Sequence, residues 1–309
     1  MSAVISVALP VFAIIAAGYF AGFRNILTKE DVGSLNKFVF NFAMPTTLFG
    51  LTANADKITG DDLIFASTYG VTALFVLFAS YGIGRRVFHL TPETAGTHAF
   101  ASTLGNAVFL GLPIAMALPG WGENFVILML VEGVVIISIG AALMSPRGKT
   151  GLLNFLVKPI TNPLVAAMIA GLSFSYVAPF LGASLPEPVV KFIEILGRAA
   201  GPTALFSLGL FLATSKISAI EKISGRIIAI TLMKMVCLPI LFLGGLFLFG
   251  ITDPVLIGPA ALFALVPTGV GAFVMATQYG KYKSETAAAI AVTTIISVFT
   301  VSGVLLIWA

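Results

Sequence analysis

The chain has 309 residues, of which 58% are hydrophobic and only 10% are charged. A soluble domain carries about 25% charged residues, so this composition excludes a soluble protein and indicates an integral membrane protein. The net charge of +4 does not indicate a nucleic-acid partner, because the basic residues fall in short loops between apolar segments. The single cysteine, Cys237, excludes an intramolecular disulfide and a multi-cysteine metal site.

Apolar stretches of about 20 residues follow one another along the chain, and each is long enough as a helix to cross a bilayer. The expected fold is therefore an all-α polytopic membrane protein. The first stretch has no basic lead-in and no cleavage site, so we expect a retained helix and not a signal peptide. The ten predicted transmembrane helices cover residues 3–23, 32–51, 62–84, 95–118, 123–144, 159–181, 189–213, 226–250, 255–279 and 285–308.

The loop charges predict the orientation. With the N-terminus outside, twelve basic residues lie in cytoplasmic loops and two lie outside. The positive-inside rule then predicts a cell-membrane protein with both termini on the extracytoplasmic side. The cytoplasmic set is Arg24, Lys29, Arg85, Arg86, Arg147, Lys149, Lys158, Lys216, Lys222, Arg226, Lys281 and Lys283, and the outer set is Lys57 and Lys191.

The chain contains an internal repeat. Residues 43–51 match residues 200–208 at six of nine positions with an offset of 157, and the Pro, Ala and Gly pattern of residues 10–18 recurs in residues 163–171 with an offset of 153. These matches predict two five-helix repeats, residues 1–150 and 151–309. Because five is odd, the second repeat is inverted in the membrane, an architecture typical of secondary transporters.

Glycine and proline interrupt the fourth and ninth predicted helices, in "GNAVFLGLP" (residues 105–113) and "LVPTGVGAF" (residues 265–273). Proline leaves a carbonyl without its helical donor, and glycine permits unwinding. Two helices that cross at such breaks present free amides and positive dipole ends to an anion, whereas a single break is equally typical of a kink or close helix contact. The candidate substrate ligands here are Asn106, Gly111, Pro113, Pro267, Thr268, Gly269 and Gly271.

Ionisable residues inside the predicted spans are costly in lipid and indicate functional or paired positions. Glu194 and Arg198 are four residues apart and form either an intrahelical pair or part of the substrate path. The repeat places Asn41 opposite Arg198, so both are candidate substrate ligands. Glu132 either carries a proton or pairs with Lys234. The candidates for coupling or charge pairing are Glu132, Glu194, Lys37 and Lys234. The alternative for Lys37 is that its side chain extends to the membrane interface.

The sequence lacks the patterns of enzymes. His89 and His98 have no second ligand at a metal-binding spacing, and no hydrolase, protease or ATP-binding motif is present. We therefore do not expect an enzyme, a metal or another cofactor. We expect transport that is driven by a gradient.

Three motifs resemble the auxin efflux carrier family, which includes plant PIN-FORMED exporters and bacterial permeases described as malonate or other organic anion carriers. They are "LNKFVFNFAMP" ending at Pro45, "GNAVFLGLP" ending at Pro113, and "PTGVGAFVMATQYG" over residues 267–280. The resemblance covers essentially all ten predicted helices. It implies Asn106 as the polar ligand on helix 4 and Pro113 as its crossover proline. Helix 9 departs from the plant pattern, because Gly271-Ala272 stands where a second proline is expected.

The family resemblance also implies a fold shared with bile acid sodium symporters. Residues 1–60 and 155–215 would form a scaffold that dimerises, and residues 61–145 and 220–309 a moving transport domain. The expected function is elevator-type secondary transport of a small organic anion, malonate-like or auxin-like. A sodium-coupled symporter is the alternative within transport, disfavoured because the crossing of helices 4 and 9 has no carboxylate to hold sodium. The alternative outside transport is a membrane-embedded ligand sensor, which is disfavoured because no soluble signalling domain is appended.

Overall fold

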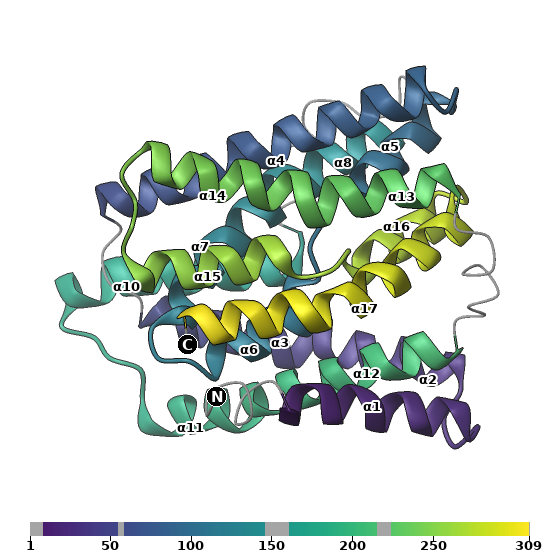
Figure 1. The fold of residues 1–309 in the computed structure, drawn as a ribbon. Helices are drawn as coiled ribbons and strands as arrows, with labels where there is room; N and C mark the ends of the chain where they lie inside the picture. The colour runs from purple at the N-terminus through teal and green to yellow at the C-terminus, as the bar shows by residue number, and fades with distance from the viewer. Residues whose placement is uncertain (1–8, 55–58, 146–160, 215–223, 309) are drawn as a thin grey trace.

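The computed structural model describes residues 9–54, 59–145, 161–214 and 224–308. The regular structure of these residues is helical, with one isolated two-residue bridge between Gly105 and Thr268. Six helical stretches are long and apolar enough to cross a membrane, and three shorter apolar helices accompany them. The chain is therefore a multi-pass membrane protein (Figure 1). Lys57, Arg147, Lys149, Lys158, Lys216 and Lys222, which entered the orientation prediction, lie outside the described residues.

The helices follow one another with few interruptions, and η denotes a widened π-helical turn. Before residue 150 they are α1 (Leu9–Phe23), α2 (Lys29–Phe38), η2 (Val39–Ala43), α3 (Met44–Ala53), α4 (Gly60–Arg86), α5 (Pro92–Ala101), η3 (Ala107–Gly111), α6 (Leu112–Met116), α7 (Trp121–Val131), η4 (Glu132–Ile136) and α8 (Ile137–Met144). After residue 150 they are α10 (Pro163–Leu181), α11 (Glu187–Arg198), α12 (Ala200–Thr214), α13 (Gly225–Leu232), η6 (Met233–Cys237), α14 (Leu238–Leu248), α15 (Pro254–Leu265), α16 (Val270–Gln278) and α17 (Lys283–Trp308).

Several helices begin where a side chain satisfies a free amide of the first turn. The side chain of Asn162 accepts from Leu164 N at 2.9 Å, directly before Pro163. Asp253 does the same for Val255 N at 2.9 Å before α15. Proline suits the first helical position because its missing N–H has no partner there. Short polar cap residues followed by proline thus set the start of these apolar helices.

Three widened turns precede prolines. The turns η2, η3 and η6 each end two residues before a proline, at Pro45, Pro113 and Pro239. In each, the amide after the turn bonds five residues back, as Met44 N does to Val39 O. A proline nitrogen cannot donate, so the ladder shifts its register and the helix continues. Span 32–51 is accordingly one helical rod that runs to Ala53 with a local bulge at Pro45.

Two other helices are interrupted fully. After α5 ends at Ala101, residues 102–106 leave the helix before η3 begins. After α15 ends at Leu265, residues 266–269 are non-helical before α16 begins. These are the breaks that glycine and proline predict in the fourth and ninth spans.

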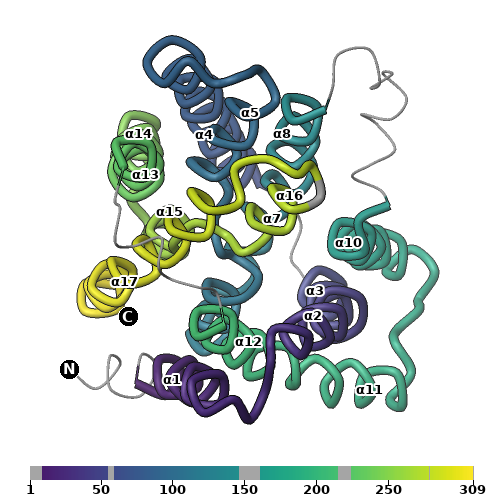
Figure 2. The backbone as a smooth tube through the Cα atoms, turned by 90° about the vertical axis from the view of Figure 1, so that its right-hand side faces the viewer, coloured from purple at the N-terminus to yellow at the C-terminus, as the bar shows by residue number. Residues whose placement is uncertain are grey.

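The helices form two groups, which Figure 2 shows from the side. Helices α1, α2, α3, α10, α11 and α12 lie together in one group, and the remaining helices form the other. Within the first group, α1 packs closely on α12 and α10 on α3. A Cβ at Gly18 of α1 would collide with the carbonyl of Phe206, and one at Gly171 of α10 with the carbonyl of Phe49. Glycine therefore allows these helix backbones to touch.

Candidate functional site

The two interrupted helices meet at their breaks. Asn106 N donates to Pro267 O at 2.8 Å, and Gly269 N donates to Leu104 O at 2.9 Å. Together these bonds make a short antiparallel bridge, whereas the other regular structure of the described residues is helical. Non-helical backbone at membrane depth requires such internal partners, since lipid offers none. The structure thus brings together the two segments that the sequence singles out.

Side chains replace the helical bond that is lost at the first break. In an unbroken helix Gly105 N would donate to Ala101 O. Instead, Gly105 N donates to the Glu132 carboxylate at 3.0 Å, and Ala101 O accepts from the Thr268 hydroxyl at 3.1 Å. Tyr69 OH also donates to the same Glu132 oxygen, Oε1, at 2.9 Å. A buried carboxylate thus reaches the crossing from η4.

The second break is satisfied in the same manner. Thr268 N, which would donate to Ala264 O in a continuous helix, donates to the Thr293 hydroxyl at 3.0 Å. The freed Ala264 carbonyl accepts from Lys234 Nζ at 2.9 Å. A Cβ on Gly105 would lie 3.6 Å from both Glu132 Oε1 and Lys234 Nζ. Glu132 and Lys234 therefore both lie close to Gly105, and the premise that the crossing offers no carboxylate is wrong.

Gly269 lies at a close approach of the two backbones. A Cβ at this position would stand 2.5 Å from the carbonyl oxygen of Gly105 and 3.0 Å from its carbon. Both are backbone atoms, which cannot rotate away as a side chain can. Glycine at residue 269 is therefore a requirement of the crossing.

A cavity of about 70 Å³ opens beside the crossing. Of the predicted site residues, Asn106, Gly269 and Gly271 line it, and so does Glu132. Most of the remaining wall is apolar, as is usual in small-molecule sites. Sequence reasoning missed Phe40, Met129, Asn162, Val165 and Met168, which also line the cavity. Asn162 gave a usable signal, since an asparagine before a proline at the start of an apolar span is a cap residue.

Asn106 is the polar group without a partner in this cavity. Its side chain is buried, with 1% of its surface exposed. In the described part of the chain, neither Oδ1 nor Nδ2 has a hydrogen-bond partner. Buried amides are normally hydrogen-bonded, so an unsatisfied one beside a cavity indicates a site for a polar ligand.

The other residues predicted on the interrupted helices hold the crossing and do not line the cavity. Both polar groups of Thr268 are engaged in the substitute bonds at the breaks. Gly111 packs under the ring of Phe125, and Pro113 lies against Gly201 of α12. Pro267 contributes its carbonyl to the bond from Asn106 N.

Four predicted residues lie away from the crossing. Arg198 and Glu194 are exposed on α11, with 3.9 Å between Nη2 and Oε2, beside a second cavity of about 660 Å³ between α3, α10 and α11. Asn41 is exposed and donates to the backbone oxygen of Lys37 at 2.8 Å. Lys37 is exposed on α2. The structure does not bring these four residues to the cavity of Asn106.

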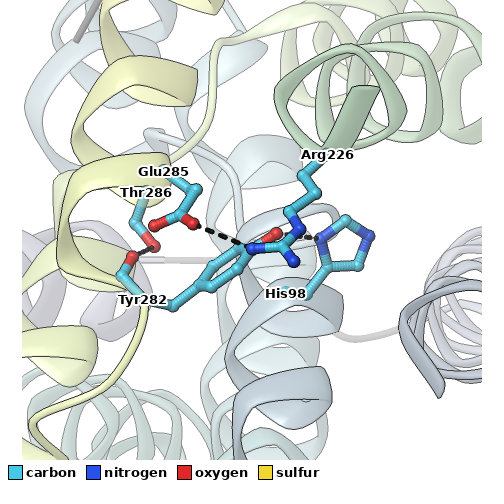
Figure 3. Close-up of polar contacts among 5 residues, drawn as sticks. All are labelled: His98, Arg226, Tyr282, Glu285 and Thr286. Atoms are coloured by element: carbon cyan, nitrogen blue, oxygen red, sulfur yellow. Dashed lines mark hydrogen bonds and ion pairs between the residues drawn. The ribbon is translucent and has the colours of Figure 1, made fainter. Parts of the chain in front are cut away.

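A separate polar cluster joins three helices at one end of the second group (Figure 3). The buried His98 of α5 bonds through Nδ1 to Tyr282 OH at 3.2 Å. Arg226 of α13 and Glu285 of α17 form an ion pair at 3.4 Å. Burial, and next the charge of Glu285, hold the pKa of the Tyr282 hydroxyl above its usual range. Tyr282 therefore stays protonated, and the cluster connects α5, α13 and α17.

Apolar membrane-length helices, interrupted helices that cross, and a buried cavity define a polytopic membrane transporter. The chain belongs to the family described as Membrane transport protein, the auxin efflux carrier family, whose model matches residues 3–305. Membership identifies a transporter and not an enzyme.

Individual relatives span most of the chain. A Rhizobium meliloti protein named "Putative malonate transporter" is 29% identical over 99% of this chain and 96% of its own length. An uncharacterized transporter of Methanocaldococcus jannaschii is 30% identical over 67% of this chain and 68% of its own. The auxin efflux carrier component 8 of Arabidopsis thaliana is 24% identical over 90% of each chain. The family resemblance stated from the three motifs is thus confirmed.

Proposed function

We propose that the protein is a secondary transporter of a small organic anion, which binds in the cavity beside Asn106. The observation that carries this proposal is the buried Asn106 amide, which lacks a partner within the described residues and lines the cavity. An amide N–H₂ donates readily to a carboxylate. The names of two relatives, a malonate transporter and an auxin efflux carrier, support a carboxylate substrate.

The proposed fold has ten membrane-spanning helices in two inverted five-helix repeats. Helix packing supports it. Gly18 meets the carbonyl of Phe206, and Gly171 meets that of Phe49. The two glycines differ by the repeat offset of 153, and the two phenylalanines differ by the offset of 157. Equivalent residues of the two repeats therefore make equivalent contacts, as a two-fold axis in the membrane plane requires.

The proposed movement is an elevator-type displacement of residues 61–145 and 220–309 against a scaffold of residues 1–60 and 155–215. Support comes from the two helix groups (Figure 2) and from the cavity, whose wall has Phe40 and Met168 on the scaffold side and Asn106 and Glu132 on the other. A ligand between the groups would be exposed to alternate sides as one group moves.

We place the protein in a cell membrane with both termini on the extracytoplasmic side. We also propose that it forms a homodimer through the scaffold. The dimer is supported by α11, on which Phe192 and Ile195 are largely exposed. Arg198 and Glu194 lie on the same helix. We place these two residues, with Lys37 and Asn41, on the scaffold and outside the substrate site.

Substitution of Asn106 tests the site. In liposomes containing the purified protein, uptake of mono- and dicarboxylates should saturate. Asn106→Ala should weaken the apparent affinity by at least about ten-fold, since a hydrogen bond to a charged group contributes about 1.5–3 kcal/mol. Asn54→Ala is the matched control, because Asn54 is exposed and its amide donates only to Gly50 O among described contacts, at 2.8 Å.

Equal affinity of the Asn106→Ala variant and the control would remove Asn106 from the site. Saturable binding without any movement of the anion across the bilayer would contradict transport and favour a membrane-embedded sensor.

A further inference from the structure

We propose that Glu132 is a proton-binding site of the transporter and that one proton accompanies each anion through the cavity. This inference rests on the proposed anion transport and adds its co-substrate. Its basis is the position of the carboxylate in the wall of the same cavity as Asn106.

Two buried side chains of opposite charge lie at the cavity. Among its described lining residues, Glu132 alone carries a charge, and the ammonium group of Lys234 also lies beside Gly105. Both side chains are buried, with 5% and 1% of their surfaces exposed. One carboxylate and one ammonium group balance each other, so the region is neutral before a substrate enters.

A bound anion would change the balance of charge beside Glu132. A carboxylate that binds at Asn106 brings a further negative charge into this buried region, next to the carboxylate of Glu132. Burial of an uncompensated charge is strongly unfavourable. A proton on Glu132 removes the like charge and leaves the ammonium group of Lys234 to balance the anion. Anion and proton therefore bind favourably together.

The hydrogen bonds that Glu132 accepts leave one of its carboxylate oxygens available for a proton. The bonds from Gly105 N and Tyr69 OH both end on Oε1, and within the described residues none ends on Oε2. A proton added at Oε2 converts the carboxylate to a carboxylic acid whose Oε1 still accepts both bonds. The crossing thus remains intact when the proton binds, and also when it leaves with the anion.

The neighbours of Glu132 favour a proton over a sodium ion. The titratable groups that face it are Tyr69 on α4 and Lys234 on η6, and its nearest backbone group is the N–H of Gly105. All three present donors or positive charge, whereas a hard metal cation requires several oxygen ligands. The ammonium group of Lys234 also repels a cation at this position.

Proton movement can be measured directly in liposomes that contain the full chain, with malonate as the probe and a pH-sensitive dye inside. We expect malonate entry to acidify the lumen. One bound proton predicts a change in apparent affinity of up to about ten-fold for each unit of external pH. In Glu132→Gln, the lumen acidification per malonate transported and the accumulation driven by the pH gradient should be lost, because the amide oxygen can still accept both bonds but the side chain binds no proton. Glu123→Gln, an exposed acid on the same helical rod, should behave as the wild type.

The possible results separate three claims: the coupled proton, its assignment to Glu132, and anion transport itself. Wild-type counterflow without lumen acidification, or accumulation driven by sodium instead of protons, would overturn the proton site and leave anion transport intact. Acidification that persists in Glu132→Gln would overturn the assignment to Glu132. The absence of counterflow with every carboxylate of the panel would contradict the proposed function, and the proton site with it. The dye measurement on the wild type keeps its meaning even if Glu132→Gln does not fold.

Discussion

At the scale of single residues, the candidate site depends on backbone atoms as much as on side chains. Four of the hydrogen-bonding groups that lose their helical partners at the two breaks are satisfied by the side chains of Glu132, Lys234, Thr268 and Thr293. Each unsatisfied group would cost several kcal/mol in a membrane, so these side chains are needed for the crossing to exist.

The close approach of Gly269 to the backbone of Gly105 can be tested by substitution. Gly269→Ala places a methyl group against the carbonyl of Gly105, at 2.5 Å from its oxygen. We expect the purified variant to unfold at a lower temperature, with a loss of about 1–3 kcal/mol, as is typical of overpacking. Gly303→Ala is the control, because a Cβ there meets nothing within 4 Å. Equal melting temperatures of the two variants would contradict the close approach.

The sequence was more informative about the breaks than about their partners. Asn106 and Gly269 stand beside helix-breaking residues, and this local signal was sufficient to select them. Glu132 is 27 residues from Gly105 in sequence, and its direction depends on the rotation of its helix. The widened turn η4 begins at Glu132 without a proline to predict it, and such a turn changes that rotation. Its bond to Gly105 therefore required the structure.

At the scale of helices, local capping decides where each element begins. The first turn of α2 is closed by Asp31, whose Oδ2 accepts from Thr28 N at 2.8 Å and from the Thr28 hydroxyl at 2.9 Å. These bonds, first that from the backbone and then that from the hydroxyl, lower the pKa of Asp31. Within the described residues, helix bounds were predictable to within a few residues because apolar length and cap residues act locally, whereas the predicted starts at residues 3 and 159 lie outside the described ranges. The widened turns before Pro45 and Pro239 were not predictable, because a helix can accommodate a proline by a kink as well as by a widened turn.

The capped turn of α2 should depend on pH. The lowered pKa means that the cap is complete above the ordinary aspartate value of about 3.9 and is lost as the pH falls through the lowered value. We expect amide exchange at residues 31–34, corrected for its intrinsic pH dependence, to lose protection under acid conditions. Asp31→Asn should remove this dependence, and the neighbouring Glu30→Gln should retain it. An unchanged acid profile in Asp31→Asn would exclude the cap as its cause.

At the scale of the whole molecule, two groups of helices meet at the cavity beside Asn106, and neither group is continuous in the sequence (Figure 2). The proposed internal repeat predicts such interleaving, because it assigns equivalent helices of each half to the same group. The place of Arg198 was not predictable, since repeat arithmetic aligns residues along helices and not around them. Its side chain turns outward on α11.

The proposed orientation can be checked with reporters. A periplasm-active alkaline phosphatase fused after Ala309 should be active in cells, and a fluorescent protein fused there should be dark. The same reporters inserted after residue 86, beside Arg85 and Arg86, should give the opposite pattern, since basic loops are retained in the cytoplasm. A fluorescent fusion at Ala309 would place the C-terminus inside and contradict ten spans with an outside N-terminus.

The bridge between Gly105 and Thr268 also bears on how a transporter acquires a new specificity. Its two cross-strand bonds, from Asn106 N to Pro267 O and from Gly269 N to Leu104 O, use main-chain atoms only. Side chains of the cavity wall such as Met129 and Val165 take no part in those bonds. Substitutions at such positions can reshape the cavity while the crossing keeps its main-chain bonds. An architecture of this kind allows descendants of one ancestor to diverge toward different solutes without rebuilding the fold.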